Sequence, residues 1–350
     1  MIEASAILTV GPGYKKPKGG ISAVENSYSH FYYPFNHIVT VDGGNTITKF
    51  YFFIKAFFVF FITLFQPQIK IIHFHVASNA SFKRKAIFIL LAKVFNKKII
   101  FHSHGGGFKD YTKRNPRIVR YVIGNCDVVV ALSETWKLYF ESVLNVKRVV
   151  IIPNPVDTPS ENHSTRSENL VVFLFLGAIN DNKGVFDLLE VVNEYKEYLN
   201  GKAKFLLGGN GEIDRLNQMI HNYQIENIVE FRGWVQGEDK IEILNNSHVF
   251  VLPSYIEGVP ISILEAETYH LPIITTNVGG IPSIVKEGVN GYLLRPGDKQ
   301  ALSKAILEMV SNRELREKMS SASYQYARPH LLPEVEKKLT DLYEELIASC

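Results

Sequence analysis

Two glutamates lie close together in the run EGVPISILEAETYHLPIITTNVGG, which begins at residue 257. Seven residues separate Glu257 from Glu265, and Gly258 and Pro260 follow the first glutamate, ahead of an apolar helical pattern. Proline suits the first position of a helix, because its missing N–H would have no partner there. The pattern therefore predicts a helix that begins just after Glu257.

The start of this predicted helix has the chemistry of an anion site. The first N–H groups of a helix have no partner within it, so those of Val259, Ile261 and Ser262 would face a phosphate in the loop, with the positive end of the helix dipole. Glu265 would follow about a turn and a half later, where a carboxylate can accept hydrogen bonds from vicinal hydroxyls such as those of a ribose. The run is typical of a nucleotide-sugar site. The alternative is a surface helix whose two glutamates are merely solvated.

The sequence then continues in a fixed order of elements. A buried-strand pattern, LPIITT, precedes Gly279-Gly280 and Ile281-Pro282, and EGVNGYLLRPGD follows from Glu287 to Asp298. In this order and spacing the chain resembles the retaining glycosyltransferases of family 4 (group 1), in their bacterial surface-polysaccharide branch. The resemblance implies the GT-B fold, an α/β architecture in which two Rossmann-like domains face each other across a cleft.

Length and hydrophobic pattern agree with two domains. A chain of 350 residues exceeds what one core usually supports. Short apolar runs rich in β-branched residues alternate with helix-length segments in both halves, which favours parallel sheets covered by helices. We expect an N-terminal Rossmann-like, acceptor-binding domain at 1–157, a polar linker at 158–169 and a Rossmann-like donor-binding domain at 170–330. By resemblance, a C-terminal helix at 331–350 crosses back to the first domain.

Composition and charge limit the classes of partner. The two cysteines, Cys126 and Cys350, offer no disulfide framework and no metal-ligand spacing, and they favour a reducing compartment. Residues 1–160 contain 20 Lys and Arg against 8 Asp and Glu, whereas residues 161–350 contain 18 against 27. The basic half predicts an anionic partner, either a membrane surface or a lipid diphosphate acceptor. No nucleic-acid motif accompanies the charge, so nucleic acid is not expected as a partner.

One segment, FYFFIKAFFVFFITLF at 50–65, is apolar enough to suggest a membrane span. Its sixteen residues include Lys55, and a spanning helix needs ~20 apolar residues. We therefore interpret the segment as a helix of the protein core or of a membrane interface, and we favour the core. The N-terminal run MIEASAILTVGPG lacks the pattern of a signal peptide and is expected to form the first strand.

Two motifs in the first half could contact a ligand. Gly19-Gly20 precede the helical run ISAVENSYSHF and resemble the glycine pair that the family places near the donor diphosphate, although a plain flexible loop is the alternative. His104, in FHSHGGGF, coincides with a histidine that the family places beside the donor sugar. His73 and His75, in IIHFHVAS, match less well and are interpreted as structural.

In the second half, FLGAINDNKGV resembles the phosphate-binding segment of the family. Lys183 and Gly177 match its lysine and first glycine, but Ala178 stands where most members carry arginine. An arginine there could hold the diphosphate through two parallel hydrogen bonds, so its absence weakens the expected anchoring unless another cation replaces it. We consider Arg232 a possible substitute. The GGNGE turn, with Gly209 and Gly211, resembles the family's turn near the nucleobase, although a tight strand-to-helix turn alone would also need glycine.

By resemblance, the chain is expected to transfer a hexose-type sugar from a nucleoside diphosphate donor, UDP-linked, to a hydroxyl of a lipid-linked or polysaccharide acceptor in bacterial cell-surface glycan biosynthesis. The configuration at the anomeric carbon would be retained. His104, Glu257 and Lys183 would act at the donor sugar and its diphosphate, with no metal and no cofactor. The expected location is the cytoplasm, peripherally on the inner face of the cytoplasmic membrane.

Three rival functions differ in what they require. A glycoside hydrolase needs two carboxylates that face each other across a sugar, whereas Glu257 and Glu265 share one loop and helix. A GT-B UDP-sugar epimerase needs no acceptor, so it leaves the basic half unexplained. A non-catalytic nucleotide-sugar-binding subunit is the third, and Ala178 is the residue that keeps it open.

Overall fold

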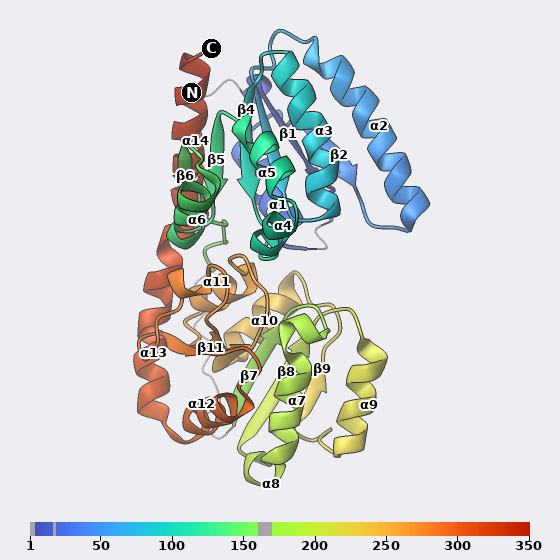
Figure 1. The fold of residues 1–350 in the computed structure, drawn as a ribbon. Helices are drawn as coiled ribbons and strands as arrows, with labels where there is room; N and C mark the ends of the chain where they lie inside the picture. Colours follow the sequence, from blue (N-terminus) through green and yellow to red (C-terminus); the bar gives the residue numbers. More distant parts are fainter. Residues whose placement is uncertain (1–3, 17–18, 160–169) are drawn as a thin grey trace. The chain divides into compact units, whose positions relative to one another are not determined.

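The structure, a computed structural model, describes residues 4–16, 19–159 and 170–350. It divides into two compact units, one formed by Met1–Pro155 with His330–Cys350 and the other by Val156–Pro329. Each unit contains one six-stranded parallel sheet with helices packed around it (Figure 1). This is the α/β architecture that the alternating apolar runs predict. The predicted linker at 158–169 falls almost entirely outside the described residues.

The first unit has the strand order β2-β1-β3-β4-β5-β6. Its strands are β1 (Ile7–Pro12), β2 (His37–Val41), β3 (Ile71–Val76), β4 (Lys98–Ser103), β5 (Val128–Ala131) and β6 (Val149–Ile151). The apolar runs predict all of them except β2. In β2, buried and half-exposed residues alternate because it lies at the edge of the sheet, and so short an alternating run is a weak signal by itself.

Seven helices of the described residues accompany this sheet. They are α1 (Gly20–Phe31), α2 (Thr46–Leu64), α3 (Ala80–Val94), α4 (Phe108–Arg114), α5 (Pro116–Gly124), α6 (Glu134–Leu144) and, from the end of the chain, α14 (Leu332–Ala348). Helix α14 packs on α1 and β3. The hydroxyl of Tyr343 lies 2.6 Å from Nδ1 of His73, so α14 contributes to the interior of the first unit.

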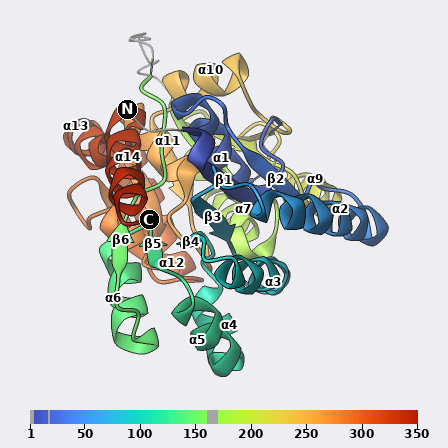
Figure 2. The same cartoon turned by 90° about the horizontal axis from the view of Figure 1, so that it is seen from above.

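Helix α2 differs from its expected place in the core. It begins at Thr46, four residues before the apolar run, and its 19 residues are long and apolar enough to cross a membrane, by length and composition only. Only 17% of its most apolar window is buried. Figures 1 and 2 show it beside α3 at one edge of the first unit. The preference for a core helix was therefore wrong, because a run apolar on every face does not reveal which face is covered.

The second unit has the strand order β12-β11-β10-β7-β8-β9. Its strands are β7 (Val171–Leu176), β8 (Ala203–Gly208), β9 (Val229–Phe231), β10 (Val249–Leu252), β11 (Ile273–Thr276) and β12 (Gly291–Leu294). Its helices are α7 (Val185–Glu194), α8 (Lys196–Leu199), α9 (Ile213–Tyr223), α10 (Glu238–Asn246), α11 (Ile261–Thr268), α12 (Lys299–Ser311) and α13 (Arg313–Ala327). The loops after β7, β8 and β10 meet at one edge of the sheet, because parallel strands end on the same side.

Candidate functional site

Lys183 lies in a short turn between β7 and α7. The turn is η2 (Asp181–Lys183), a 3₁₀ helix, and the side chain of Asn180 caps it by accepting a hydrogen bond of 3.2 Å from the backbone N–H of Lys183. The next residue, Gly184, approaches the end of β10 so closely that a Cβ would lie 2.1 Å from the carbonyl oxygen of Pro253. This approach brings Lys183 beside the loop that follows β10.

The β10 loop supplies the partner of that lysine. Nζ of Lys183 lies 2.5 Å from Oε1 of Glu257, and the hydroxyl of Ser254 donates to the same oxygen at 2.9 Å. The lysine side chain is 26% exposed and the glutamate side chain 8%. A pair so little exposed keeps much of its attraction, yet the ammonium can still be reached from solvent. The structure thus joins two residues that the sequence placed 74 positions apart.

The backbone that carries Glu257 rests on the Gly279-Gly280 turn. Gly279 has φ +58°, and a Cβ there would lie 1.9 Å from the carbonyl oxygen of Glu257. The N–H of Gly280 donates to the carbonyl oxygen of Gly258 at 2.6 Å. Glycine at 279 is therefore required both by its backbone conformation and by the close contact.

Helix α11 begins later than the sequence suggests. Pro260 is its N-cap, with extended φ −70° and ψ 126°, and Ile261 is the first helical residue. The sequence places proline at the first helical position, whereas the observed helix begins one residue later. Gly258, Val259 and Pro260 form a buried approach to the helix. The first N–H groups of α11, at Ile261 and beyond, keep the orientation that suits an anion.

Glu265 lies in the second turn of α11 and forms a second ion pair. Its Oε1 is 2.6 Å from Nζ of Lys240 on α10, and the two side chains are 24% and 32% exposed. Sequence reasoning missed Lys240, because α10 shows no motif and the approach of Lys240 to Glu265 is a tertiary feature. The two predicted glutamates thus have one lysine partner each.

The glycines after β7 and β8 hold two loops in contact. A Cβ at Gly209 would lie 1.8 Å from the carbonyl oxygen of Gly177, and one at Gly211 would lie 2.4 Å from that of Ile179. Ile179 and Gly211 also form an isolated parallel bridge. Any side chain at Gly209 would push these loops apart, so both glycines have a structural role that does not depend on a nucleobase.

The structure places Arg232 on the surface, in a pair with Glu230. Its Nη1 is 2.8 Å from Oε1 of that glutamate, and the arginine side chain is 43% exposed. Arg215 lies closer to the Lys183 turn, because its guanidinium bonds Asp181 at 3.0 Å and stacks 3.7 Å from the ring centroid of Phe186. Sequence reasoning did not single out Arg215, which no motif marks.

A pocket of about 430 Å³ opens beside the Lys183 turn. One wall carries a hydrogen bond of 2.7 Å from the hydroxyl of Tyr255 to Oδ2 of Asp187. The remaining walls are formed by residues next to Lys183 and Glu257 in the chain. The lining residues are Asp181, Asn182, Gly184, Phe186, Asp187, Tyr255 and Ile256.

In the first unit, Gly19 is the N-cap of α1 and Gly20 is its first residue. A Cβ at Gly19 would meet nothing within 4 Å, so packing does not explain a glycine at this position. Helix α1 carries the buried Glu25, which lies 3.3 Å from Nε2 of His37. Burial raises the pKa of the Glu25 carboxyl, and the neighbouring His37 and Lys85 lower it.

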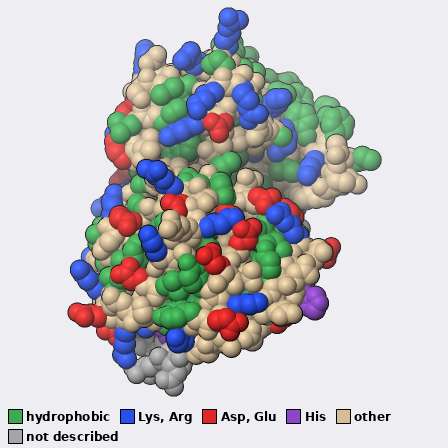
Figure 3. All heavy atoms as spheres, turned by 60° about the horizontal axis from the view of Figure 1, so that its bottom comes forward, with side chains coloured by type: hydrophobic (Ala, Val, Ile, Leu, Met, Phe, Trp, Pro, Cys, Tyr) green, Lys and Arg blue, Asp and Glu red, His purple; other side chains and the backbone are tan. Residues whose placement is uncertain are grey.

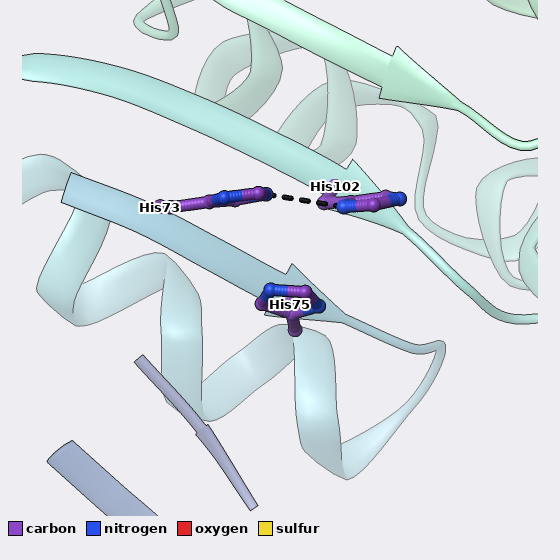
Figure 4. Close-up of side chains that lie close together, drawn as sticks. All are labelled: His73, His75 and His102. Atoms are coloured by element: carbon purple, nitrogen blue, oxygen red, sulfur yellow. Dashed lines mark hydrogen bonds between the residues drawn. The ribbon is translucent and has the colours of Figure 1, made fainter. Parts of the chain in front are cut away.

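Four histidines gather at the carboxyl ends of β3 and β4. Nε2 of His73 lies 3.1 Å from Nδ1 of His102, and Nδ1 of His75 lies 2.8 Å from Nε2 of His104. Figure 4 shows the first three, with the bond between His73 and His102. His104 was predicted to act, and His73 and His75 were interpreted as structural. The structure makes these histidines parts of one cluster, with His75 bonded directly to His104.

Burial keeps this cluster uncharged. It lowers the pKa of His73 to about 3, with a further contribution from the nearby His104, and it lowers the pKa of His75 and His102 well below the usual value. The pKa of His104 is also lowered to about 3, first by burial and then by the charge of Lys85, while the side chain of Asn154 opposes the shift. Neutral imidazoles can both donate and accept hydrogen bonds, so the cluster suits hydroxyl groups.

The same histidines have the geometry of a possible metal site. One ligand atom from each of His73, His75 and His102 lies within 4.8 Å of the others. In the structure, however, two of these rings are bonded to each other. Sequence spacing did not suggest this group, because it depends on β3 and β4 being neighbours in the sheet.

Comparison with known proteins gives a consistent assignment. The family described as "Glycosyl transferases group 1" matches residues 157–326, and "Glycosyltransferase Family 4" matches residues 23–159. A Schizosaccharomyces pombe protein, the gpi3 subunit of phosphatidylinositol N-acetylglucosaminyltransferase, is 26% identical over 308 residues, which are 85% of this chain and 65% of the yeast protein. The chain thus spans less than two thirds of that relative.

The match to this chain covers more of the length of a second relative and of one solved structure. The Escherichia coli UDP-Gal:alpha-D-GlcNAc-diphosphoundecaprenol alpha-1,3-galactosyltransferase is 24% identical over 326 residues, which are 84% of this chain and 80% of the enzyme. The crystal structure of Anabaena HepE in complex with UDP superposes with a TM-score of 0.75 at 16% identity, covering 97% of this chain and 99% of HepE. At that identity the superposition shows the fold alone.

Proposed function

Since this chain belongs to the group 1 and family 4 glycosyltransferases with the GT-B fold, we propose that it moves a hexose-type sugar from a UDP-sugar to a hydroxyl of a lipid-linked or polysaccharide acceptor, with retention of configuration. The pair formed by Lys183 and Glu257 carries the proposal. It places a cation for the diphosphate beside a carboxylate for the sugar hydroxyls, next to the start of α11.

The chemistry of the transfer explains why these two residues lie together. Negative charge develops on the leaving diphosphate as the glycosidic bond breaks, and fixed positive groups stabilise that charge. Lys183 and the first N–H groups of α11 would supply them. Without a donor, Glu257 neutralises the ammonium. When a donor binds, its diphosphate would take over the lysine, and Glu257 would then be free to accept hydrogen bonds from the sugar.

The remaining parts of the proposal rest on the relatives. One relative is named as a galactosyltransferase that uses UDP-Gal and a diphosphoundecaprenol acceptor, and HepE was crystallised with UDP. In this chain Glu265 would hold the ribose, with Lys240 orienting it, and His104 would hydrogen-bond a sugar hydroxyl. A lipid-linked acceptor fits the basic first half and a place at the inner face of the cytoplasmic membrane. Neither metal nor cofactor is required by this scheme.

A donor screen followed by product analysis tests the proposal. Calorimetric titration with UDP, GDP and ADP and their common sugars, with magnesium or with EDTA, should show UDP-sugar binding that EDTA does not change. NMR of the product formed on a polyprenyl diphosphate-linked sugar should then show the donor's anomeric configuration. Conversion of the UDP-sugar into its epimer without an acceptor would show that the protein is an epimerase and not a transferase. Binding without any turnover would favour the non-catalytic subunit that Ala178 keeps open, and failure of every nucleotide to bind would overturn the donor site.

A further inference from the structure

Helix α2 is apolar on two opposite faces. Its inward face contains the buried Ala56, Phe60 and Leu64 and packs against the first unit, where the ring centroid of Phe60 lies 4.9 Å from that of Phe88 on α3. Nine large hydrophobic residues of α2 and its C-cap are 38% to 78% exposed, and all of them except Val59 lie on one outward side. The eight on that side are Ile47, Phe50, Tyr51, Ile54, Phe58, Phe61, Ile62 and Phe65.

The outward residues form one continuous stripe. At about 100° per residue, all eight fall within about 60° of a single line along the helix. A helix that faces water normally carries polar residues on that side. Here the outward side is as apolar as the inward one, and an exposed patch of this kind marks a site of interaction. Figure 3 shows hydrophobic side chains gathered at the upper right, over the region where α2 lies in Figure 1.

The surroundings of the stripe are basic. No acidic residue occurs between Asp42 and Asp110. Three exposed lysines accompany the stripe and the neighbouring α3; they are Lys55, Lys83 and Lys93. Helix α3 also adds the exposed Ile87 and Val94. Lys85, two residues after Lys83 on α3, is buried. The positive charge near the stripe therefore comes from Lys55 on α2 and from Lys83 and Lys93 on α3.

Apolar and aromatic side chains flanked by lysines suit the surface of an anionic bilayer. Aromatic rings settle at the boundary between headgroups and acyl chains, and lysines attract anionic headgroups. The inward face of α2 is already packed on the protein. The helix would therefore lie along the membrane surface and not cross it.

We propose that the outward face of α2 docks this protein on an anionic phospholipid bilayer, with Phe50, Phe58 and Ile62 entering the interface and Lys55, Lys83 and Lys93 contacting headgroups. This inference rests on the proposed function in one respect, because the lipid-linked acceptor of that function would lie in the membrane to which the protein docks. The docking surface itself is defined by α2 and α3 alone.

Vesicle sedimentation tests the docking. The parent protein should sediment with phosphatidylcholine vesicles that contain phosphatidylglycerol, should bind less at 0.5 M salt, and should bind pure phosphatidylcholine more weakly. Phe58→Glu and Ile62→Glu should each lower the partition coefficient by about ten-fold or more, because each exchanges an inserted apolar side chain for a charge. Leu138→Glu, at a 55% exposed position on α6, should change it by less than about two-fold.

Insertion also has a direct readout that does not depend on a disruptive substitution. Phe58→Trp should show a blue-shifted emission and quenching by brominated acyl chains when vesicles are added, whereas Leu138→Trp should show neither. Docking would be overturned if the parent did not bind anionic vesicles or if Phe58→Trp were not quenched. It would also be overturned if sedimentation velocity showed a dimer that Phe58→Glu dissolves, since a second copy would then cover the face.

Failure of docking can be told apart from failure of the proposed function. Phe58→Glu should bind UDP as the parent does and should turn over a short-chain, water-soluble acceptor at the parent's rate. Turnover of that acceptor without vesicle binding would remove the docking and leave the transferase intact. Vesicle binding without UDP binding would leave the docking intact and remove the proposed donor site.

Discussion

The two units carry opposite kinds of polar chemistry in comparable places. After β7 and β10 of the second unit, Lys183 and Glu257 form an ion pair that solvent can still reach. At the ends of β3 and β4 in the first unit, histidines bond one another and burial keeps them neutral. Within the same α/β architecture, the lysine and carboxylate after β7 and β10 are charged, whereas the imidazoles that are buried together at β3 and β4 are neutral. We expect the second unit to recognise charged groups and the first to recognise hydroxyls.

The strongest test of this contrast removes the charge of Lys183. Lys183→Met should reduce sugar transfer by about 10²- to 10³-fold, because the leaving diphosphate loses a fixed cation. Steady-state assays with the preferred donor measure the loss. Lys204→Met is a matched control, since Lys204 has a similar 24% exposure and also pairs with a glutamate. Parent-like turnover of Lys183→Met would show that the pair has no catalytic role.

The neutral histidines predict a loss of stability in acid. The pKa of the fully buried His73 is about 3 in the folded protein and ~6.5 in an unfolded chain. Between these values the unfolded chain binds more protons, so the free energy of unfolding falls as the pH falls. For His73 alone the loss between pH 6.5 and pH 5 is about 2 kcal/mol. Urea unfolding across this range measures it.

A matched pair of histidine variants assigns that acid effect. His73→Asn should make the free energy of unfolding less dependent on pH, by up to one proton. His221→Asn is the control for replacing a histidine, because that side chain is 85% exposed in the second unit. Equal slopes for the parent and for His73→Asn would mean that His73 takes up protons in the folded protein as it does in the unfolded chain, and the contrast between the units would disappear.

The second ion pair should have a smaller effect, on affinity more than on turnover. Glu265→Gln should weaken UDP binding by about ten-fold, because an amide accepts hydrogen bonds from ribose hydroxyls less strongly than a carboxylate does. Lys240→Met should weaken it less, since Lys240 only orients the glutamate. Isothermal titration with UDP measures both. If UDP bound to Glu265→Gln as tightly as to the parent, the ribose assignment would have to be abandoned.

The smallest effect is expected at Arg232. Its guanidinium is exposed and paired with Glu230, so Arg232→Ala should change donor affinity by less than about two-fold. Arg215→Ala is the informative comparison, because Arg215 bonds Asp181 in the turn that carries Lys183. A larger loss at Arg232 than at Arg215 would restore Arg232 as the replacement for the arginine missing at position 178.

Sequence alone predicted the parts of this molecule that depend on local pattern. The buried strands are apolar runs of the right length, and Gly279 marks a turn that a side chain would block. The start of α11 was misplaced because proline also fits an N-cap. The partner of Glu265 could not be foreseen, since nothing near Lys240 in the sequence indicates that its side chain reaches α11.

Two further features needed the three-dimensional structure for different reasons. Alternation already places His73 with His75, and His102 with His104, on one side of each strand. Only the order of strands brings the two pairs together. For α2 the pattern was uninformative in another way, because an apolar run at 50–65 fits a helix covered on all sides as well as one covered on half.

Helix α14 sets the order in which the protein can be completed during synthesis. Residues 330–350 belong to the first unit, and Tyr343 reaches His73 within it. Domains emerging from the ribosome generally fold from the N-terminus onward. Here every residue of the second unit is made before the first unit has its last helix. The N-terminal half must therefore wait, with part of its interior open, until residues 330–350 have been translated.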